Sequence, residues 1–184
     1  MSIYTPSDDS FFFAVFLKEY LNKIKVKEIS YIDIGTGSGI LSEIASEFIK
    51  KENILATDID KESLDLVKEK GFRTINSNLF SKISKTKKFN LITFNAPYLP
   101  EDKMYTEPKD SKRATTGGKR GDEISLKFLK QAQQHLTKDG KIFLLISSLT
   151  PRDRIKKFKP KIVARTKIFF ERLLILEITQ NKNL

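Results

Sequence analysis

Apolar residues in this chain occur as short continuous runs and as longer stretches in which they recur every three or four positions. The short runs predict buried strands, and the periodic stretches predict amphipathic helices. We expect strands at 31–34, 53–57, 73–75, 89–94, 141–147, 161–169 and 172–179, and helices at 8–23, 39–50, 61–70 and 123–136. Strands and helices therefore alternate until the last two strands, which follow each other directly.

This order of elements predicts an α/β fold. Alternating strands and helices favour a mostly parallel sheet covered on both faces, and the final two strands favour an antiparallel pair at one edge. A length of 184 residues is typical of one domain. We therefore expect residues 1–184 to form a single domain that begins with a helical element over residues 1–27.

The stretch from Pro100 to Gly121 does not fit this alternation. It has no apolar periodicity, and its second half contains Gly117 and Gly118. A loop of this length inside a compact domain is typically a lid or a binding segment. We expect residues 100–121 to form a substrate loop.

Composition narrows the chemistry that the chain can perform. It has no cysteine, which excludes disulfides and thiolate–metal sites and favours a reducing compartment, the cytoplasm. The single histidine, His135, lies in a polar helical stretch and is expected at the solvated surface. A Ser-His-Asp triad and a multi-histidine metal site are therefore not expected. No apolar run is long enough to predict a membrane span.

The formal net charge is +11, and much of it is concentrated near the C-terminus. Nine lysines and arginines lie between Pro151 and Arg172, where Asp153 and Glu171 are the acidic residues. Such a surface attracts acidic partners, so contact with RNA or the ribosome is one interpretation. The alternative is that these residues cover an ordinary solvated face.

Two segments carry candidate chemistry for a nucleoside cofactor. The strand ending at Ile34 opens into a glycine-rich turn, in which Gly35, Gly37 and Gly39 allow close backbone approach to a ligand. Ile40 stands where a dinucleotide fingerprint has glycine, which disfavours NAD. Asp58 ends the next strand, where a carboxylate accepts ribose hydroxyls. Asp33 is placed to approach the ammonium group of a bound amino acid.

The third candidate segment is Asn95-Ala96-Pro97-Tyr98, directly after an apolar strand. Pro97 favours extended geometry at Ala96 and so directs the Ala96 carbonyl. This carbonyl and the Asn95 side-chain oxygen together can accept both hydrogens of a planar NH₂ group. Tyr98 lies outside the apolar strand and is expected to form a wall of the reacting site. The same tetrapeptide is also compatible with an ordinary turn.

Together these motifs resemble the HemK/PrmC-type, SAM-dependent (S-adenosylmethionine-dependent) protein-glutamine N5-methyltransferases, in their short archaeal and eukaryotic branch. The resemblance covers nearly the whole chain. The matching elements are Tyr4-Thr5-Pro6-Ser7-Asp8-Asp9-Ser10, Asp33 to Gly39, Thr57-Asp58-Ile59-Asp60, Ser77-Asn78-Leu79-Phe80, Asn95 to Tyr98, and Gly117-Gly118-Lys119-Arg120-Gly121. Two positions depart from the family pattern: Ala96 replaces a proline, and Asn78 replaces an aspartate.

The resemblance implies a Rossmann-like class I methyltransferase fold with SAM as cofactor. It places Tyr4, Pro6 and Ser10 in an N-terminal element that closes over the cofactor. It assigns the adenine contact to Asn78 and Leu79, and Asn95 borders both cofactor and substrate. The catalytic residues are then Asn95, Ala96, Pro97 and Tyr98, and the cofactor-binding residues are Tyr4, Pro6, Ser10, Asp33, Gly35, Gly37, Gly39, Asp58, Asn78, Leu79 and Asn95.

The implied reaction is methylation of the glutamine in the Gly-Gly-Gln motif of a class I translation termination (release) factor. Two alternatives remain open: methylation of exocyclic amino groups of RNA or DNA bases, and a non-catalytic scaffold subunit. The resemblance also implies a small zinc-ribbon activator protein as partner in a heterodimer. We expect this partner to add a strand at the edge formed by residues 72–75, where Phe72 and Ile75 are expected to be accessible. The alternative is that both side chains pack in this chain's own core.

Overall fold

The computed structural model describes residues 7–24, 28–101, 115–168 and 171–181. Its helices are α1 (Asp8–Ile24), α2 (Ile40–Ser46), α3 (Lys61–Glu69) and α5 (Glu123–Ala132), with short 3₁₀ helices at Lys51–Asn53, Gln133–His135 and Lys156–Phe158. Its strands are β1 (Tyr31–Ile34), β2 (Ile54–Asp58), β3 (Arg73–Asn76), β4 (Phe89–Asn95), β5 (Leu99–Pro100), β6 (Thr116–Gly118), β7 (Leu136–Ser147), β8 (Lys161–Ile168) and β9 (Glu171–Thr179).

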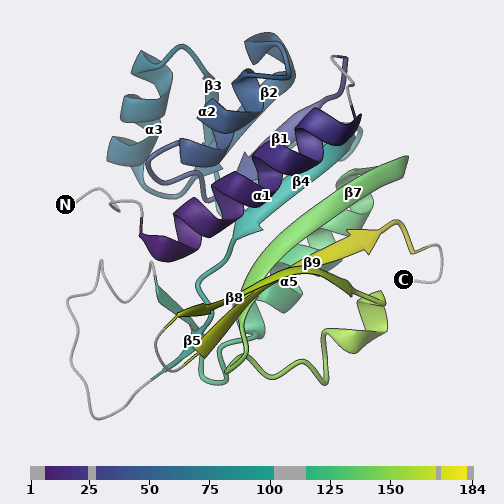
Figure 1. Ribbon diagram of the computed structural model, residues 1–184. Helices are drawn as coiled ribbons and strands as arrows, with labels where there is room; N and C mark the ends of the chain where they lie inside the picture. The colour runs from purple at the N-terminus through teal and green to yellow at the C-terminus, as the bar shows by residue number, and fades with distance from the viewer. Residues whose placement is uncertain (1–6, 25–27, 102–114, 169–170, 182–184) are drawn as a thin grey trace.

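Seven of these strands form one sheet in the order β3-β2-β1-β4-β7-β9-β8 (Figure 1). The five strands from β3 to β7 are parallel, whereas β9 is antiparallel to both β7 and β8. This confirms the predicted mostly parallel sheet with an antiparallel C-terminal pair. Among the described strands of this sheet, β3 and β8 form its two edges.

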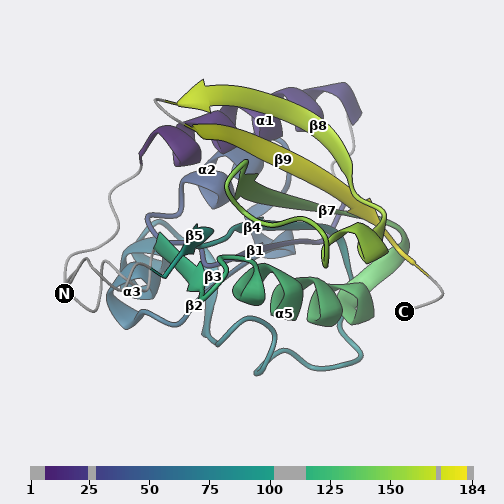
Figure 2. The same cartoon turned by 90° about the horizontal axis from the view of Figure 1, so that it is seen from below.

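Helices cover both faces of the sheet, as Figure 2 shows with α1 and α2 on one side and α5 on the other. Side chains along each central strand alternate between two apolar clusters. Ile32 and Ile92 pack in the cluster beneath α5, whereas Tyr31 and Leu91 pack in the cluster beneath α1 and α2. This alternation is the two-residue period of a strand that is buried on both faces.

The predicted strand at 141–147 is longer than expected, and the preceding helix is shorter. The α-helix ends at Ala132, and β7 already begins at Leu136. Leu136 pairs with Phe89, while Lys141 pairs with Leu91, so the register between β4 and β7 shifts here. An irregular insertion in the strand therefore replaces the predicted turn at Asp139-Gly140.

His135 is buried, which makes the predicted solvated position wrong. Its side chain stacks on the ring of Phe80, with centroids 4.6 Å apart. Its Nδ1 lies 2.8 Å from the carbonyl oxygen of Lys87. Pairing of Leu136 with β4 draws the end of the helical stretch onto the sheet, and an isolated polar stretch gave no sign of this contact.

The ends of the predicted substrate loop have regular structure. Leu99–Pro100 and Thr116–Gly118 pair as the parallel strands β5 and β6. Residues 102–114 lie outside the described residues. Within the described part of the chain, no helix is long and apolar enough to cross a membrane.

Candidate active site

The predicted cofactor residues meet at the carboxyl ends of β1 and β2. The backbone N–H of Gly37 donates to Oδ2 of Asp58 over 3.0 Å, and the N–H of Thr36 donates to the Thr57 carbonyl over 2.9 Å. These bonds join the glycine turn to the neighbouring strand. Ligands of open α/β sheets bind outside the carboxyl ends of the strands, next to the point where the strand order reverses. In this sheet that point lies between β1 and β4.

Gly39 shows why the glycine turn needs glycine. It has φ +86°, and a Cβ there would lie 2.8 Å from Cγ2 of Val67 on α3. A side chain would therefore be strained in its backbone and would also press against the neighbouring helix. The turn holds α2 and α3 close together at the edge of the site.

Asp33 lies beneath the turn and is only 1% exposed. Its Oδ2 accepts hydrogen bonds from Thr36 Oγ1 (2.8 Å) and Ser42 Oγ (3.0 Å), and its Oδ1 accepts from Thr93 Oγ1 (3.0 Å). Thr93 Oγ1 in turn lies 2.6 Å from the hydroxyl of Tyr31. Both carboxylate oxygens are thus engaged in holding the turn to β1 and β4. Contact of Asp33 with an ammonium group stays a prediction.

Burial shifts the titration of both acidic residues. Burial raises the pKa of the Asp33 carboxyl to about 6, although the hydroxyl donors from Thr36, Ser42 and Thr93 oppose this shift. Burial also raises the pKa of the Asp58 carboxyl, and backbone donors, first from Asp60 and then from Gly37, lower it. Asp33 is therefore the more strongly perturbed of the two carboxyls.

The segment predicted to contact adenine is tied to the same edge. The N–H of Ser77 donates to the carbonyl of Asp58 over 2.8 Å. Leu79 has φ 54°, a left-handed conformation that is strained for leucine and is often found at functional sites. The Asn78 side chain is exposed, and Lys127 Nζ lies 3.5 Å from its Oδ1.

Asn95 ends β4 and is held by the first turn of α1. Its Nδ2 donates to Oδ2 of Asp9 over 3.1 Å and approaches Ser10 Oγ at 3.5 Å. Its Oδ1 is buried and has no hydrogen-bond partner within the described residues. The structure therefore places Ser10 next to Asn95, and the binding roles of both residues stay predictions. Tyr4 and Pro6 lie outside the described residues.

The next three residues of the tetrapeptide pack against the glycine-rich element that precedes α5. Ala96 is buried in the cluster beneath α5, whereas Tyr98 packs against the opposite cluster. A Cβ on Gly117 would lie 2.6 Å from the Pro97 carbonyl oxygen and 2.3 Å from that of Gly121. Gly117 is therefore required because the two backbones touch at this point.

An ion pair holds this glycine-rich element in place. Asp122 is fully buried and pairs with the guanidinium of Arg154. The Nε–H of Arg154 donates a hydrogen bond to Oδ2 of Asp122 over 2.9 Å. Arg120 donates to Asp153 over 2.7 Å. From the sequence alone, Arg154 belongs to a basic segment that is either a surface for acidic partners or an ordinary solvated face; in the structure it pairs with a buried carboxylate.

The glycine turn, Asp58, the Ser77–Leu79 segment and the tetrapeptide thus all lie at the carboxyl ends of the parallel strands. Sequence reasoning missed the supporting residues Asp9, Thr36 and Thr93. Asp9 belongs to the N-terminal element that was recognised, so its signal was present. A carboxylate beside a glycine turn fits an adenosine-containing cofactor, and an unpartnered acceptor beyond it fits an NH₂ group. The described residues contain no cluster of three or more potential metal ligands.

In sequence, the chain is similar to protein methyltransferases. A relative from Methanocaldococcus jannaschii, named "Putative protein N5-glutamine methyltransferase", is 34% identical over 95% of this chain and 90% of its own length. The release factor glutamine methyltransferase of Lactococcus lactis is 32% identical over 64% of this chain. This chain spans 47% of that bacterial relative, about half its length. A family model described as ribosomal protein L11 methyltransferase (PrmA) matches residues 16–95.

Solved structures share the fold over nearly the whole chain. The E. cuniculi Mtq2–Trm112 complex, described as responsible for methylation of the eRF1 translation termination factor, has a TM-score of 0.74 at 20% identity, covering 98% of this chain and 100% of the matched one. The ribosomal protein L11 methylase of Lactobacillus delbrueckii has a TM-score of 0.65 at 21% identity, covering 95% and 81%. These likenesses establish the class I SAM-dependent methyltransferase fold.

Proposed function

The chain belongs to the family of protein N5-glutamine methyltransferases, and we propose that it methylates the side-chain amide of a glutamine, using SAM as methyl donor. The glutamine that we propose is the one in the Gly-Gly-Gln motif of a class I translation termination factor. The Lactococcus lactis relative is named for a release factor and the E. cuniculi complex for a termination factor, which supports this choice.

The cofactor site that we propose runs along the carboxyl ends of the neighbouring strands β3, β2, β1 and β4. Asp58 accepts hydrogen bonds from the ribose hydroxyls, and the glycine turn approaches the cofactor through its backbone. Asn78 and Leu79 border the adenine, and Ser10, with Tyr4 and Pro6, closes the site from the N-terminal side. When bound, SAM supplies a methyl group on a positively charged sulfur, which is the electrophile of the reaction.

The residues of the tetrapeptide orient the acceptor. An amide nitrogen is a poor nucleophile because its lone pair is delocalised into the carbonyl group, so alignment has to supply most of the catalysis. Asn95 Oδ1 accepts one hydrogen of the glutamine NH₂ group, and the Ala96 carbonyl accepts the other. Tyr98 packs beside the amide and limits its rotation, while Pro97 keeps Ala96 extended.

One observation carries this proposal: the buried Oδ1 of Asn95 lacks a donor among the described residues, although Asn95 Nδ2 is bonded. A buried acceptor without a donor is costly, and native proteins rarely leave one without a reason. The NH₂ group of a substrate amide is a donor of suitable chemistry. Together with the Ala96 carbonyl, this oxygen favours an NH₂ group, which has two hydrogens to donate, over a hydroxyl, which has one, and a thiolate, which has none.

The test is methyl transfer from labelled SAM to a purified class I termination factor. We expect labelling of the wild-type factor and none of a factor in which the motif glutamine is replaced by alanine. Transfer to tRNA or DNA provides the comparison arm, because the +11 charge favours base methylation as the second candidate. Labelling of nucleic acid alone would overturn the protein substrate.

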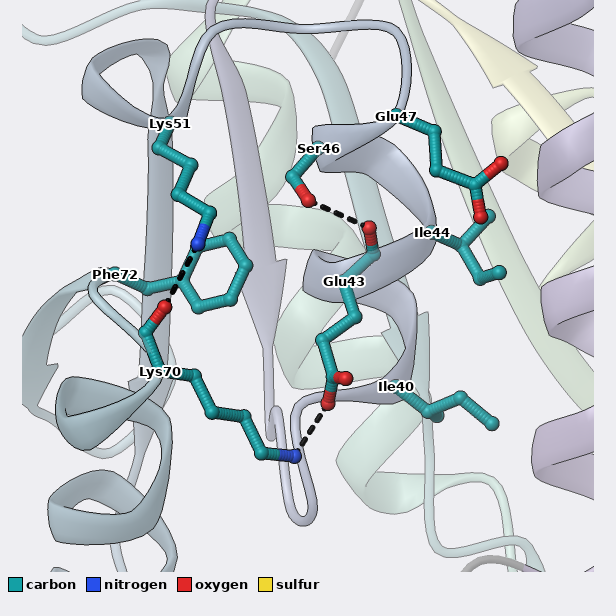
Figure 3. A pocket seen from close by; sticks show the side chains of 8 residues that line it. All are labelled: Ile40, Glu43, Ile44, Ser46, Glu47, Lys51, Lys70 and Phe72. Carbon is teal, nitrogen blue, oxygen red and sulfur yellow. Dashed lines mark hydrogen bonds and ion pairs between the residues drawn. The ribbon is translucent and has the colours of Figure 1, made fainter.

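We also propose that a small zinc-ribbon activator adds a strand at the free edge of β3. Beside this edge lies a pocket between α2 and the chain entering β3, in which Glu43 and Ser46 of α2 face Lys51, Lys70 and Phe72 (Figure 3). Lys51 and Phe72 precede β2 and β3, so the pocket lies toward the end of the sheet opposite Asp58. A partner strand on β3 would bring its neighbouring side chains to this pocket.

The structure changes which residues report on such a partner. Phe72 is only 4% exposed and packs in the chain's own core, with Lys51 Nζ 4.8 Å from its ring centre. The predicted accessibility of Phe72 is therefore wrong, and Ile75 also packs partly against a core cluster. Neither residue is a clean probe of the edge, because its substitution would perturb folding as well.

Arg73→Asp on β3 is the sharper test, because Arg73 is exposed on this edge strand, and Arg165→Asp, exposed on the opposite edge strand β8, is its matched control. We expect Arg73→Asp to weaken co-purification with the zinc-ribbon protein by tenfold or more, since it reverses a charge in the interface (a loss of about 1.4 kcal/mol or more). Arg165→Asp should bind normally. Equal binding by both variants would place the partner elsewhere.

A further inference from the structure

The two ends of the Asn95 side-chain amide have opposite hydrogen-bonding capacity. Oδ1 only accepts, and Nδ2 only donates, so a rotation of the amide by half a turn exchanges an acceptor for a donor. The β4 backbone does not distinguish the two orientations, because both ends of the amide have nearly the same shape. An acceptor role for Asn95 therefore requires another group that holds Nδ2 away from the substrate.

Asp9 supplies such a group. An ionised carboxylate has acceptors and no donor, so the contact of 3.1 Å between Asp9 Oδ2 and Asn95 forces Nδ2 to face Asp9. The opposite orientation would bring two oxygens together. Asn95 Oδ1 then points away from Asp9, and it is this atom that is buried without a donor in the described structure.

The Asp9 carboxylate is itself held at its other oxygen. Oδ1 accepts from the backbone N–H of Ser10 over 2.7 Å, and the Ser7 hydroxyl donates to the same atom. Asp9 lies in the first turn of α1, where the helix dipole stabilises a negative charge, and it is only 9% exposed. One oxygen therefore anchors the side chain to the helix, and the other is directed at Asn95.

We propose that Asp9 is a positioning residue, which sets the orientation of the Asn95 amide so that Oδ1 is presented to the NH₂ group of the acceptor. The assignment deepens the proposed function and rests on it for the identity of the acceptor. It links the N-terminal helix to the chemistry across 86 residues of sequence. Asp9 thus helps to orient the methyl-accepting amide, in addition to belonging to the N-terminal element at the cofactor.

The variant Asp9→Asn tests this role with little change in shape. Its side-chain NH₂ can donate to Asn95, which permits the reversed amide and removes the acceptor from the substrate side. We expect kcat to fall by roughly tenfold or more while KM and Kd for SAM stay within about twofold. Glu19→Gln is the matched control, because Glu19 is an exposed carboxylate on the same helix, outside the N-terminal motif.

Two further variants separate positioning from folding. Asp9→Ala removes the carboxylate altogether and should also lower kcat with little change in SAM affinity. In an Asn95→Ala background, Asp9→Asn should add less than about a threefold loss, because the residue through which it acts is gone. Fully multiplicative losses in the double variant, or an equal loss of kcat in Glu19→Gln, would overturn the proposal.

A readout without any substrate distinguishes this proposal from the proposed function. The ¹⁵N–¹H₂ side-chain signal of Asn95, identified by its loss in Asn95→Ala, should show slow solvent exchange in the wild-type protein. In Asp9→Asn this signal should shift, while the melting temperature and SAM binding remain similar. An unchanged Asn95 signal would overturn the positioning role, whatever the acceptor is. A shifted signal together with no transfer to the termination factor would reject the proposed substrate and leave Asp9 in its role.

Discussion

The cofactor half of the candidate site is held mostly by residues that are near in sequence, whereas its acceptor half is held by residues that are far apart. In the cofactor half, Asp33 accepts from Thr36 and Ser42, 3 and 9 residues away, and Asp58 accepts from Gly37, 21 residues away. The exception is Thr93, which donates to Asp33 at a separation of 60 residues. In the acceptor half, Asn95 is held by Asp9 at a separation of 86 residues. The carbonyl of Tyr98 accepts from Thr150 at a separation of 52.

The two halves also differ in how completely their polar groups are bonded. Both oxygens of Asp33 and both oxygens of Asp58 accept hydrogen bonds from the protein. Asn95, by contrast, has one bonded end and one buried end without a donor in the described residues. This contrast teaches that the cofactor half is organised before ligand binding, whereas the acceptor half is one hydrogen bond short. That missing bond is where we place the substrate.

The largest effect is expected from breaking the acceptor half at Asn95. Asn95→Ala removes one acceptor and lets the substrate amide rotate out of line, so turnover should fall by roughly 10²-fold or more. SAM affinity, measured on the same protein, should change by less than about threefold. Asn90→Ala, at the other end of β4, is the matched control. Normal turnover in Asn95→Ala would remove this residue from the mechanism.

Gly117→Ala disturbs the acceptor half by displacing the backbone of the tetrapeptide. The new Cβ would approach the carbonyl oxygens of Gly121 and Pro97 to 2.3 and 2.6 Å, so the tetrapeptide has to move. We expect turnover to fall roughly ten- to a hundredfold, with SAM affinity much less affected. Lys119→Ala, at an exposed position of the same element, should be near wild type. If Gly117→Ala weakens SAM binding as strongly as turnover, the two halves are not independent.

Asp58→Ala should show the reverse pattern in the cofactor half. Loss of a charge-assisted hydrogen bond costs about 1.5–3 kcal/mol, which predicts about a tenfold or larger rise in the Kd for SAM. Turnover at saturating SAM should remain within about threefold. Calorimetric titration measures the affinity, and Asp65→Ala on the exposed side of α3 controls for the lost charge. NAD binding as tight as SAM binding would contradict the assignment of this half.

Asp33 makes the stability of the cofactor half depend on pH. Its folded-state pKa of about 6 exceeds the ordinary value of 3.8, so the folded protein binds more protons between these values than the unfolded chain does. The contribution of Asp33 to the free energy of unfolding is therefore greatest below pH 4 and falls as the pH rises through 6. The expected loss is on the order of 3 kcal/mol.

Asp33→Asn should remove this part of the pH dependence. Denaturant unfolding at pH 4, 5, 6 and 7 measures the slope for both proteins, and Asp65→Asn serves as the exposed control. A fall in stability toward neutral pH that is as steep in Asp33→Asn as in the wild type would show that the buried carboxyl is not the source.

The smallest effect is expected where this chain departs from its family. Ala96→Pro keeps the carbonyl that accepts from the substrate, and Asn95 already has the extended strand geometry that a following proline favours. Activity should remain within about threefold of wild type. A loss as large as that of Asn95→Ala would show that the buried Ala96 site cannot take a larger ring.

Local patterns were sufficient to predict the parallel sheet and most of the cofactor half. The glycine turn and Asp58 are recognisable because each follows a short apolar strand and because their spacing keeps them at one edge. The burial of His135 and the pairing of Arg154 with Asp122 were not predictable in this way. Both depend on which surfaces the sheet brings together, and neither changes the local apolar pattern.

The sequence by itself determined the fold class, the end of the sheet at which the candidate site lies, and the identity of the residues at the ends of β1, β2 and β4. Only the tertiary structure decided that Asp9 reaches Asn95 and that Gly117 touches Pro97. Strand periodicity and turn residues report on neighbours within a few positions. The orientation of a single side-chain amide depends on a contact formed only after α1 packs across the sheet (Figure 1).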